Sequence, residues 1–139
     1  MKWFVTTVAC CLLTVATSNF PAQSQTVFKK ALQQKYGFKS VSCNACHQKG
    51  KDADGKSLSK EHRNEFGEAL HGLLAEKNAS QRIKDAKKAG ADARKKMNAE
   101  VTVEFLEALT DVEKMESPDG PSWGELLRDG KMEGVKVKE

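Results

Sequence analysis

The pentapeptide Cys43-Asn44-Ala45-Cys46-His47 places two thiols and an imidazole within five residues, and it constrains this chain more than any other feature. We refer to residues 43–47 as the CNACH motif. Cysteine and histidine side chains at such spacing serve as attachment points for a cofactor, as metal ligands or as redox-active thiols. The remainder of the chain must therefore fold around whatever these three side chains hold.

The pattern C-x-x-C-H is the attachment signature of c-type haem. Two intervening residues let the thiols reach two vinyl groups on one edge of the macrocycle, and the next residue turns its imidazole under the ring. The motif predicts one covalent haem c, joined through thioether bonds to Cys43 and Cys46, with His47 as the proximal iron ligand. The function would then concern electrons or axial ligands.

Three other interpretations of the motif stay open. A thioredoxin-like C-x-x-C requires a βαβ setting, and no segment near the motif alternates as a strand does. A zinc site could combine Cys43, Cys46 and His47 with either His62 or His71, although the motif has no second paired knuckle. A short-loop disulfide between the two cysteines is the third interpretation.

The N-terminus has the pattern of a secretory signal. Met1-Lys2 gives a short basic start, an apolar run spans residues 3–16, and small residues follow. The sequence predicts a signal peptide over residues 1–22, cleaved near residue 18 or 22. An uncleaved anchor is the alternative, but the run is shorter than the roughly 20 apolar residues of a spanning helix. Processing as a lipoprotein at Cys10 is a weaker alternative, because the cut would fall in the middle of the apolar run.

Export changes the cysteine count. Cys10 and Cys11 leave with the signal, so the mature chain keeps the two cysteines of the motif. In an oxidising compartment two cysteines usually form a disulfide, whereas haem attachment consumes both. We expect a periplasmic or otherwise extracytoplasmic protein, because c-type haem is attached outside the cytoplasm. We expect no stable membrane insertion after cleavage.

The mature chain, about 115 residues long, suits one small domain. No segment alternates with period 2, whereas several fit a period of 3.6 residues. The predicted helices cover residues 24–36, 59–77, 80–97 (weakened or split at Gly90), 99–115 and 122–129. We expect an all-α domain over residues 23–130, with four to five helices around one haem that supplies missing core volume. Residues 131–139 would form a flexible tail.

This order, a helix, then the CNACH motif, then further helices, resembles small monohaem cytochromes c of the class I-like type. The stretch RNEFGEAL at residues 63–70 is similar to exported haem-motif proteins of the planctomycete type. The chain departs from the cytochrome pattern after the histidine, where Gly-Pro-x-Leu is usual and residues 48–52 read QKGKD. The resemblance implies a one-electron carrier rather than an enzyme.

The motif leaves the sixth iron ligand undecided. The resemblance favours Met115, because cytochromes of this class present a methionine from a loop before the last helix. The alternatives are His71, Met97, His62 and Met132, or an open iron. Methionine gives a higher-potential carrier and a second histidine a lower-potential one. An open site would suit a small-ligand sensor or a weak peroxidase.

Charge is divided unevenly along the chain. Residues 28–63 hold nine Lys/Arg against three Asp/Glu, and residues 100–129 hold nine Asp/Glu against two Lys/Arg. A basic surface around the motif would steer docking onto redox proteins with an acidic face, although a solvated polar surface gives the same pattern. We expect no nucleic-acid partner, because no basic residues interleave with aromatics and no binding motif is present.

Overall fold

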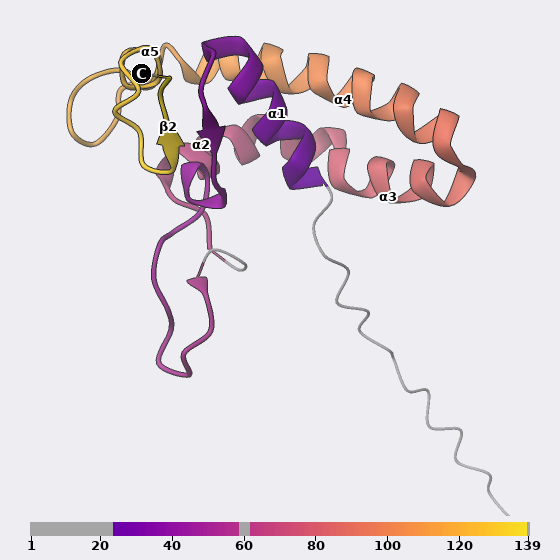
Figure 1. Cartoon of the computed structure of the whole chain (residues 1–139), viewed down its shortest axis with the longest axis horizontal. Coiled ribbons are helices and arrows are strands. Elements are labelled where there is room, and N and C mark those ends of the chain that lie inside the picture. Colours follow the sequence, from indigo (N-terminus) through magenta and orange to yellow (C-terminus); the bar gives the residue numbers. More distant parts are fainter. Residues whose placement is uncertain (1–23, 59–61, 139) are drawn as a thin grey trace, which may run out of the picture.

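The computed structural model describes residues 24–58 and 62–138 (Figure 1). These residues form five α-helices and one small sheet, so the predicted all-α class is confirmed at this level. The helices are α1 (Ser24–Tyr36), α2 (Glu65–Leu74), α3 (Ala79–Ala89), α4 (Ala91–Val112) and α5 (Trp123–Arg128). The predicted signal peptide falls outside the described residues. Within the described part, no helix is long and apolar enough to cross a membrane.

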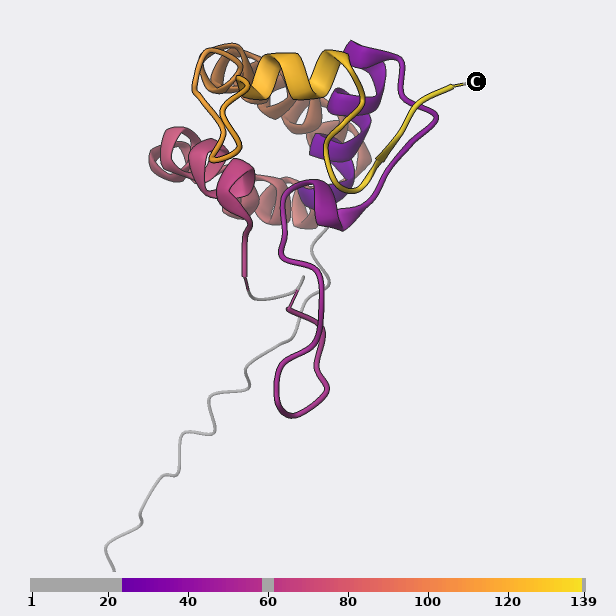
Figure 2. The same cartoon turned by 90° about the vertical axis from the view of Figure 1, so that its left-hand side faces the viewer.

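Helix α4 is the longest element, with 22 residues, and α1, α2 and α3 all pack against it. Figure 1 shows α3 running back beneath α4, and Figure 2 shows a long loop extending away from the helical body. The main core gathers large side chains of four helices. Its fully buried members include Leu32, Phe66, Phe105, Leu109 and Leu127.

Gly90 divides α3 from α4, as the sequence predicts. Its φ of 121° lies in a region that residues with a side chain rarely adopt. The helix after this break differs from the prediction, because α4 continues without interruption through residues 97–99. Arg82 of α3 pairs with Glu104 at 2.8 Å and with Glu100 at 3.4 Å, which ties α3 along the continuous α4.

Helix α2 begins later than predicted. The sequence predicts a helix over residues 59–77, whereas α2 begins at Glu65 and a 3-10 turn covers Ala75–Lys77. Residues 59–61 lie outside the described part. The Asn64 N–H donates to the Cys46 carbonyl, and the His62 carbonyl accepts the Gln48 N–H. Contacts with the CNACH motif therefore delay the start of α2.

The C-terminal segment also differs from the expected loose tail. Strand β2 (Val135–Lys136) pairs antiparallel with β1 (Ser40–Val41). Strand β1 lies just before the CNACH motif in the sequence. The Met132 side chain is 7% exposed and belongs to the main core. Ahead of it, the predicted helix over residues 122–129 is confirmed as α5, which opens on a capping box: Ser122 and Glu125 satisfy each other's backbone N–H groups.

Candidate functional site

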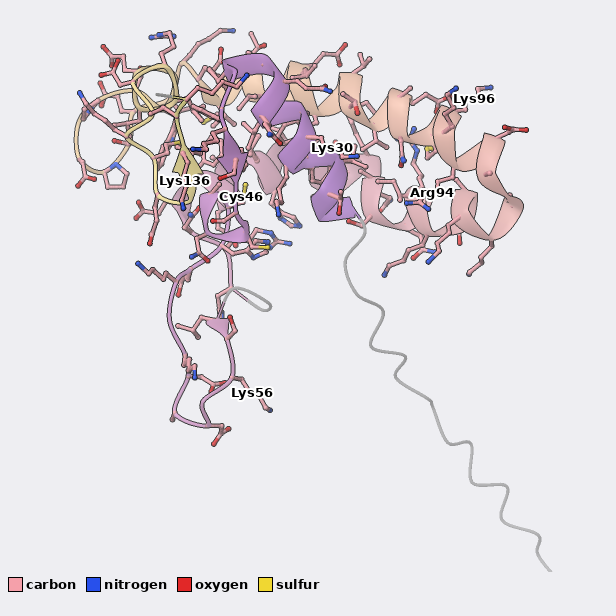
Figure 3. The ribbon with its side chains drawn as sticks, viewed as in Figure 1. Lys30, Cys46, Lys56, Arg94, Lys96 and Lys136 are labelled. Carbon is pink, nitrogen blue, oxygen red and sulfur yellow. The ribbon has the colours of Figure 1, made fainter. Side chains whose placement is uncertain are left out.

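The CNACH motif forms a single tight turn between β1 and α2. A 3-10 turn spans Cys43–Ala45, and the backbone N–H groups of Cys46 and His47 donate to the Cys43 carbonyl at 3.2 and 3.0 Å. Ala45 is buried, while the side chains of the motif's reactive residues are half-buried. The turn thus anchors its backbone in the protein and leaves Cys46, labelled in Figure 3, and His47 at a border of the core.

Asn64, the N-cap residue of α2, fastens the motif to that helix. Its Nδ2 donates to the carbonyl oxygens of Asn44 at 3.0 Å and Ala45 at 3.2 Å, and its backbone N–H donates to Cys46 at 3.1 Å. Its Oδ1 accepts from the Gly67 N–H at 2.9 Å. Sequence reasoning missed this role. The available signal was an asparagine at a capping position, followed by an apolar helix face.

Two glycines let other segments approach the backbone of the motif. A Cβ on Gly67 would lie 1.9 Å from the Cys46 carbonyl oxygen, and one on Gly134 would lie 2.4 Å from the Ala45 nitrogen. Gly134 also has a φ of 77°. Both contacts depend on the absence of a side chain. The turn is therefore enclosed by α2 on one side and by the C-terminal segment on another.

The His47 ring is oriented by a backbone contact. Its Nδ1 lies 3.2 Å from the His62 carbonyl oxygen, which also accepts the Gln48 N–H at 3.1 Å. Because a carbonyl can only accept, the contact requires the proton on Nδ1. In the neutral ring, Nε2 then carries the lone pair that binds a metal.

A cleft of about 510 Å³ adjoins the motif. Cys46 and His47 line one part of it. Its apolar wall includes Phe28 of α1, Phe105 of α4 and two leucines of α2, Leu70 and Leu74. The rings of Phe28 and Phe105 are stacked, with centroids 4.8 Å apart. The rest of the lining is largely polar and includes Asn78 and Gln81. A cleft with an apolar wall and polar groups at its border suits a cofactor that has both kinds of surface.

Arg63 and Lys84 bring positive charge to the lining of this cleft. Arg63 lies next to the cap of α2 and pairs weakly with Glu68 at 3.4 Å, whereas Lys84 comes from α3. A haem has an apolar macrocycle and two carboxylate side chains. The cleft offers both kinds of surface beside a thiol and an imidazole, so its residues fit this group.

The environment of Cys46 favours an uncharged sulfur. Burial raises the pKa of its thiol to about 12, and the neighbouring Cys43 adds to this shift. A thiolate is the form that attacks disulfides and binds zinc, and burial penalises it. A thioether carries no charge and suffers no such penalty. The residues described also contain no group of three or more His, Cys, Asp or Glu side chains arranged to hold a metal ion.

The candidates for a distal ligand are widely separated. His71 lines the cleft. Met115 is 40% exposed in the turn after α4, Met97 packs against the small cluster around Ile83, and Met132 is buried in the main core. The His62 side chain is exposed. Among the described residues that line the cleft, His71 is the one member of the predicted set.

The segment after the motif forms a basic hairpin over residues 48–58, which Figure 3 shows extending from the helical body with Lys56 near its tip. The Asp52 carboxylate shapes its turn, because Oδ1 accepts the N–H groups of Asp54 at 3.0 Å and Lys56 at 2.8 Å. Lys49 pairs with Glu133 at 3.6 Å. The lysines of residues 48–58 therefore lie on a hairpin with a fixed turn, close to the motif.

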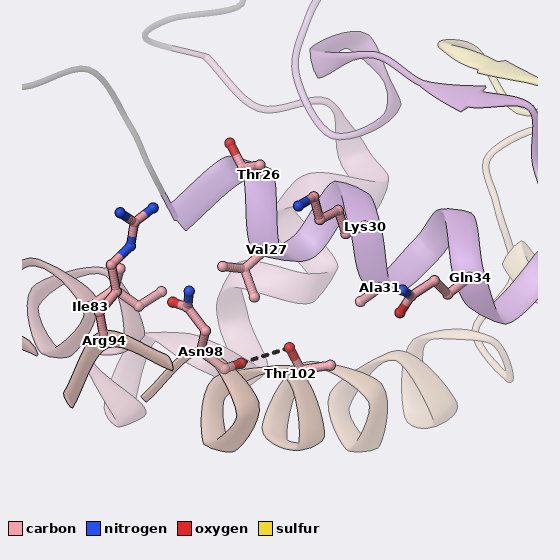
Figure 4. Close-up of a pocket in the computed structure, with 9 residues that line it drawn as sticks. All are labelled: Thr26, Val27, Lys30, Ala31, Gln34, Ile83, Arg94, Asn98 and Thr102. Atoms are coloured by element: carbon pink, nitrogen blue, oxygen red, sulfur yellow. Dashed lines mark hydrogen bonds between the residues drawn. The ribbon is translucent and has the colours of Figure 1, made fainter. Parts of the chain in front are cut away.

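A second, smaller pocket of about 210 Å³ lies between α1, α3 and α4 (Figure 4). Its described lining is mixed polar and apolar, with Lys30, Arg94 and Asn98 among the polar members. The Asn98 side chain points from α4 toward α1, and its Oδ1 is buried without a hydrogen-bond partner in the described part of the chain. The CNACH residues do not contribute to the described lining.

Comparison of the chain with protein-family models, with curated proteins and with solved structures returns no match. The comparisons therefore assign neither a family nor a relative. Functional inference rests on the arrangement of the side chains around the motif.

Proposed function

We propose that this protein is an exported monohaem c-type cytochrome that carries single electrons between redox proteins. Cys43 and Cys46 would bind the haem covalently, and the Nε2 of His47 would bind the iron. The observation that carries this proposal is the cleft with an apolar wall, lined also by the half-buried Cys46 and by His47, whose Nδ1 donates to a backbone carbonyl. Bound haem would supply a one-electron iron couple.

The cysteines attach the group by addition. Each thiol would add its sulfur to one carbon of a vinyl double bond, and the thiol hydrogen would go to the other carbon. No electron is lost or gained overall, and no leaving group forms. The Asn64 N–H, which donates to the Cys46 carbonyl at 3.1 Å, would hold the backbone of Cys46 in place during this reaction.

The remaining residues of the cleft would bind and enclose the group. The Phe28–Phe105 stack and the leucines of α2 exclude water from its apolar faces, at about 25 cal/mol for each Å² of apolar surface buried. Arg63 and Lys84 would offset the charge of its carboxylates. The Nδ1 contact would hold the ring of His47 and increase the basicity of Nε2.

The basic residues around the motif support a partner with an acidic face. Residues 28–63 carry nine Lys/Arg against three Asp/Glu, and the hairpin that begins directly after His47 contributes three lysines beside Asp52 and Asp54. A net positive surface attracts a partner of opposite charge over a Debye length of about 10 Å. Electron transfer to and from such a partner should weaken as the ionic strength rises.

A second candidate function is a small-ligand binding module or weak peroxidase with an open distal site. One observation favours it: Met115 does not contribute to the described lining of the cleft. Rapid binding of carbon monoxide to the reduced protein would support this function. A six-coordinate reduced protein that resists carbon monoxide would support the electron carrier.

The direct test of attachment uses protein exported from a host that can mature c-type cytochromes. Denatured wild-type protein should keep its haem absorption through gel filtration in urea, because thioether bonds survive unfolding. Cys43→Ala and Cys46→Ala variants should lose part of this absorption, and the double variant should lose all of it. Haem that separates from the wild-type chain in urea would contradict the proposal.

A further inference from the structure

We infer that His71 is the distal ligand of the haem iron, which would make this protein a bis-histidine cytochrome. This inference rests on the proposed function, because it needs haem at the CNACH motif. It differs from the sequence-based expectation of Met115.

The first support is the face of α2 that lines the cleft. Gly67, Leu70, His71 and Leu74 all belong to the lining. They follow one another at i, i+3, i+4 and i+7, so they share one side of the helix. The imidazole of His71 therefore belongs to the face that borders the cleft rather than to the opposite, solvated face of α2.

The second support is the way α2 is anchored on the motif. Gly67 abuts the carbonyl of Cys46, and His71 lies one turn further along, about 6 Å up the helix axis. The Asn64 cap fixes the start of the same helix on Asn44 and Ala45. The position of His71 relative to the two cysteines is thus set by short, specific contacts and not by a flexible loop.

The third support is that the His71 ring is available. Its backbone carbonyl accepts the Ala75 N–H, but among the described residues its side chain has no hydrogen bond or ion pair. It is also exposed to the solvent of the cleft. Imidazole at a haem iron normally has no competing partner on the nitrogen that binds, so this ring can bind without breaking an existing contact.

The other candidates are each held elsewhere, and Met97 packs against the small cluster around Ile83. The backbone of Met115 bonds to Val112 at 2.9 Å and to Trp123 at 3.0 Å, which fixes it at the junction of α4 and α5. Met132 fills the main core. The carbonyl of His62 contacts Nδ1 of His47, so its backbone lies on the side of that ring away from Nε2.

The test uses the exported holoprotein, and intact mass first establishes that one haem is attached. Wild-type protein should show a low-spin, six-coordinate spectrum in the ferric and ferrous forms. It should lack the weak far-red band of a sulfur-ligated ferric haem. His71→Ala should lose the low-spin spectrum and gain rapid binding of carbon monoxide. Met115→Leu, which removes the competing sulfur ligand, should leave both properties unchanged.

A haem-loaded His71→Ala protein with an unchanged low-spin spectrum would overturn the inference, and so would a wild-type protein that is already five-coordinate. If His71→Ala fails to fold, His71→Met keeps a helix-forming residue that can bind iron. It should gain the far-red band and a higher reduction potential. A folded His71→Met protein without either change would contradict the inference. An unmodified wild-type mass would instead refute the proposed function, so the two failures are distinguishable.

Discussion

Gly67 of α2 lies directly against the carbonyl oxygen of Cys46, so closely that a Cβ at this position would fall 1.9 Å from it. The contact is between backbone atoms, and neither side can yield by rotating a side chain. It fixes the helix that carries Leu70, His71 and Leu74 to the turn that carries the two cysteines. The geometry of the whole cleft depends on it.

Replacing Gly67 with Ala should therefore displace α2 from the motif. We expect the free energy of unfolding to fall by about 3 kcal/mol, because overpacking against rigid backbone strains the native state. Urea unfolding of the exported protein measures this. Gly72→Ala is the matched control, since Gly72 lies in the same helix with nothing within 4 Å of its Cβ position. It should stabilise the protein by about 0.5–1 kcal/mol. Equal effects of the two variants would contradict the close contact.

Replacing Asn64 with Ala removes a helix cap and two donors to the motif. We expect a loss of about 2–3 kcal/mol in unfolding free energy, together with a lower yield of attached haem. Asn64→Asp separates the two roles, because a carboxylate still caps α2 but cannot donate. It should recover about 1 kcal/mol of stability and leave the haem yield low. A normal yield in both variants would show that the motif does not need these donors.

Met132 and Met115 differ in burial, so a comparison of the two tests whether the C-terminal segment packs on the main core. Met132 is 7% exposed and Met115 is 40% exposed. Met132→Ala should cost about 2–4 kcal/mol by leaving a cavity, whereas Met115→Ala should cost about 0.5 kcal/mol or less. Thermal and urea unfolding of both variants measure the difference. If Met132→Ala proves neutral, residues 131–138 do not pack as described.

Glu113 links α1 to the end of α4 and should make stability depend on acid. Burial alone would raise the pKa of its carboxyl, but hydrogen bonds from Lys35 and Tyr36 outweigh it, and the pKa lies below the usual 4.5. The carboxylate therefore stabilises the fold fully above pH 4.5, and this contribution disappears as the pH falls through the lowered pKa. Glu113→Gln should flatten the stability profile in this acid range. Glu116→Gln, in an exposed position nearby, should leave the profile unchanged.

Local signals in the sequence were enough to predict several elements. Helix α1 follows the apolar periodicity of residues 24–36, Gly90 interrupts a helix, and the capping box at Ser122 opens the last one. Each of these signals acts over a few neighbouring residues. Such signals can be read without knowledge of the tertiary structure.

The features missed by sequence reasoning depend on contacts between distant segments. The late start of α2 follows from hydrogen bonds between residues 62–64 and the motif. Strand β2 forms because Val135 pairs with Val41, a residue far away in the sequence. The same return of the C-terminal segment to the helical body buries Met132 in the main core. Likewise, the predicted helix over residues 59–77 includes His71, but the packing of α2 on Cys46 determines that His71 borders the cleft.

The most direct test of the central claim is the intact mass of the protein after export from a host that matures c-type cytochromes. The account predicts a mass equal to the processed polypeptide plus one haem, with no free thiol left to react with an alkylating reagent. A mass equal to the polypeptide alone, or lower by two hydrogens as for a disulfide between Cys43 and Cys46, would contradict it.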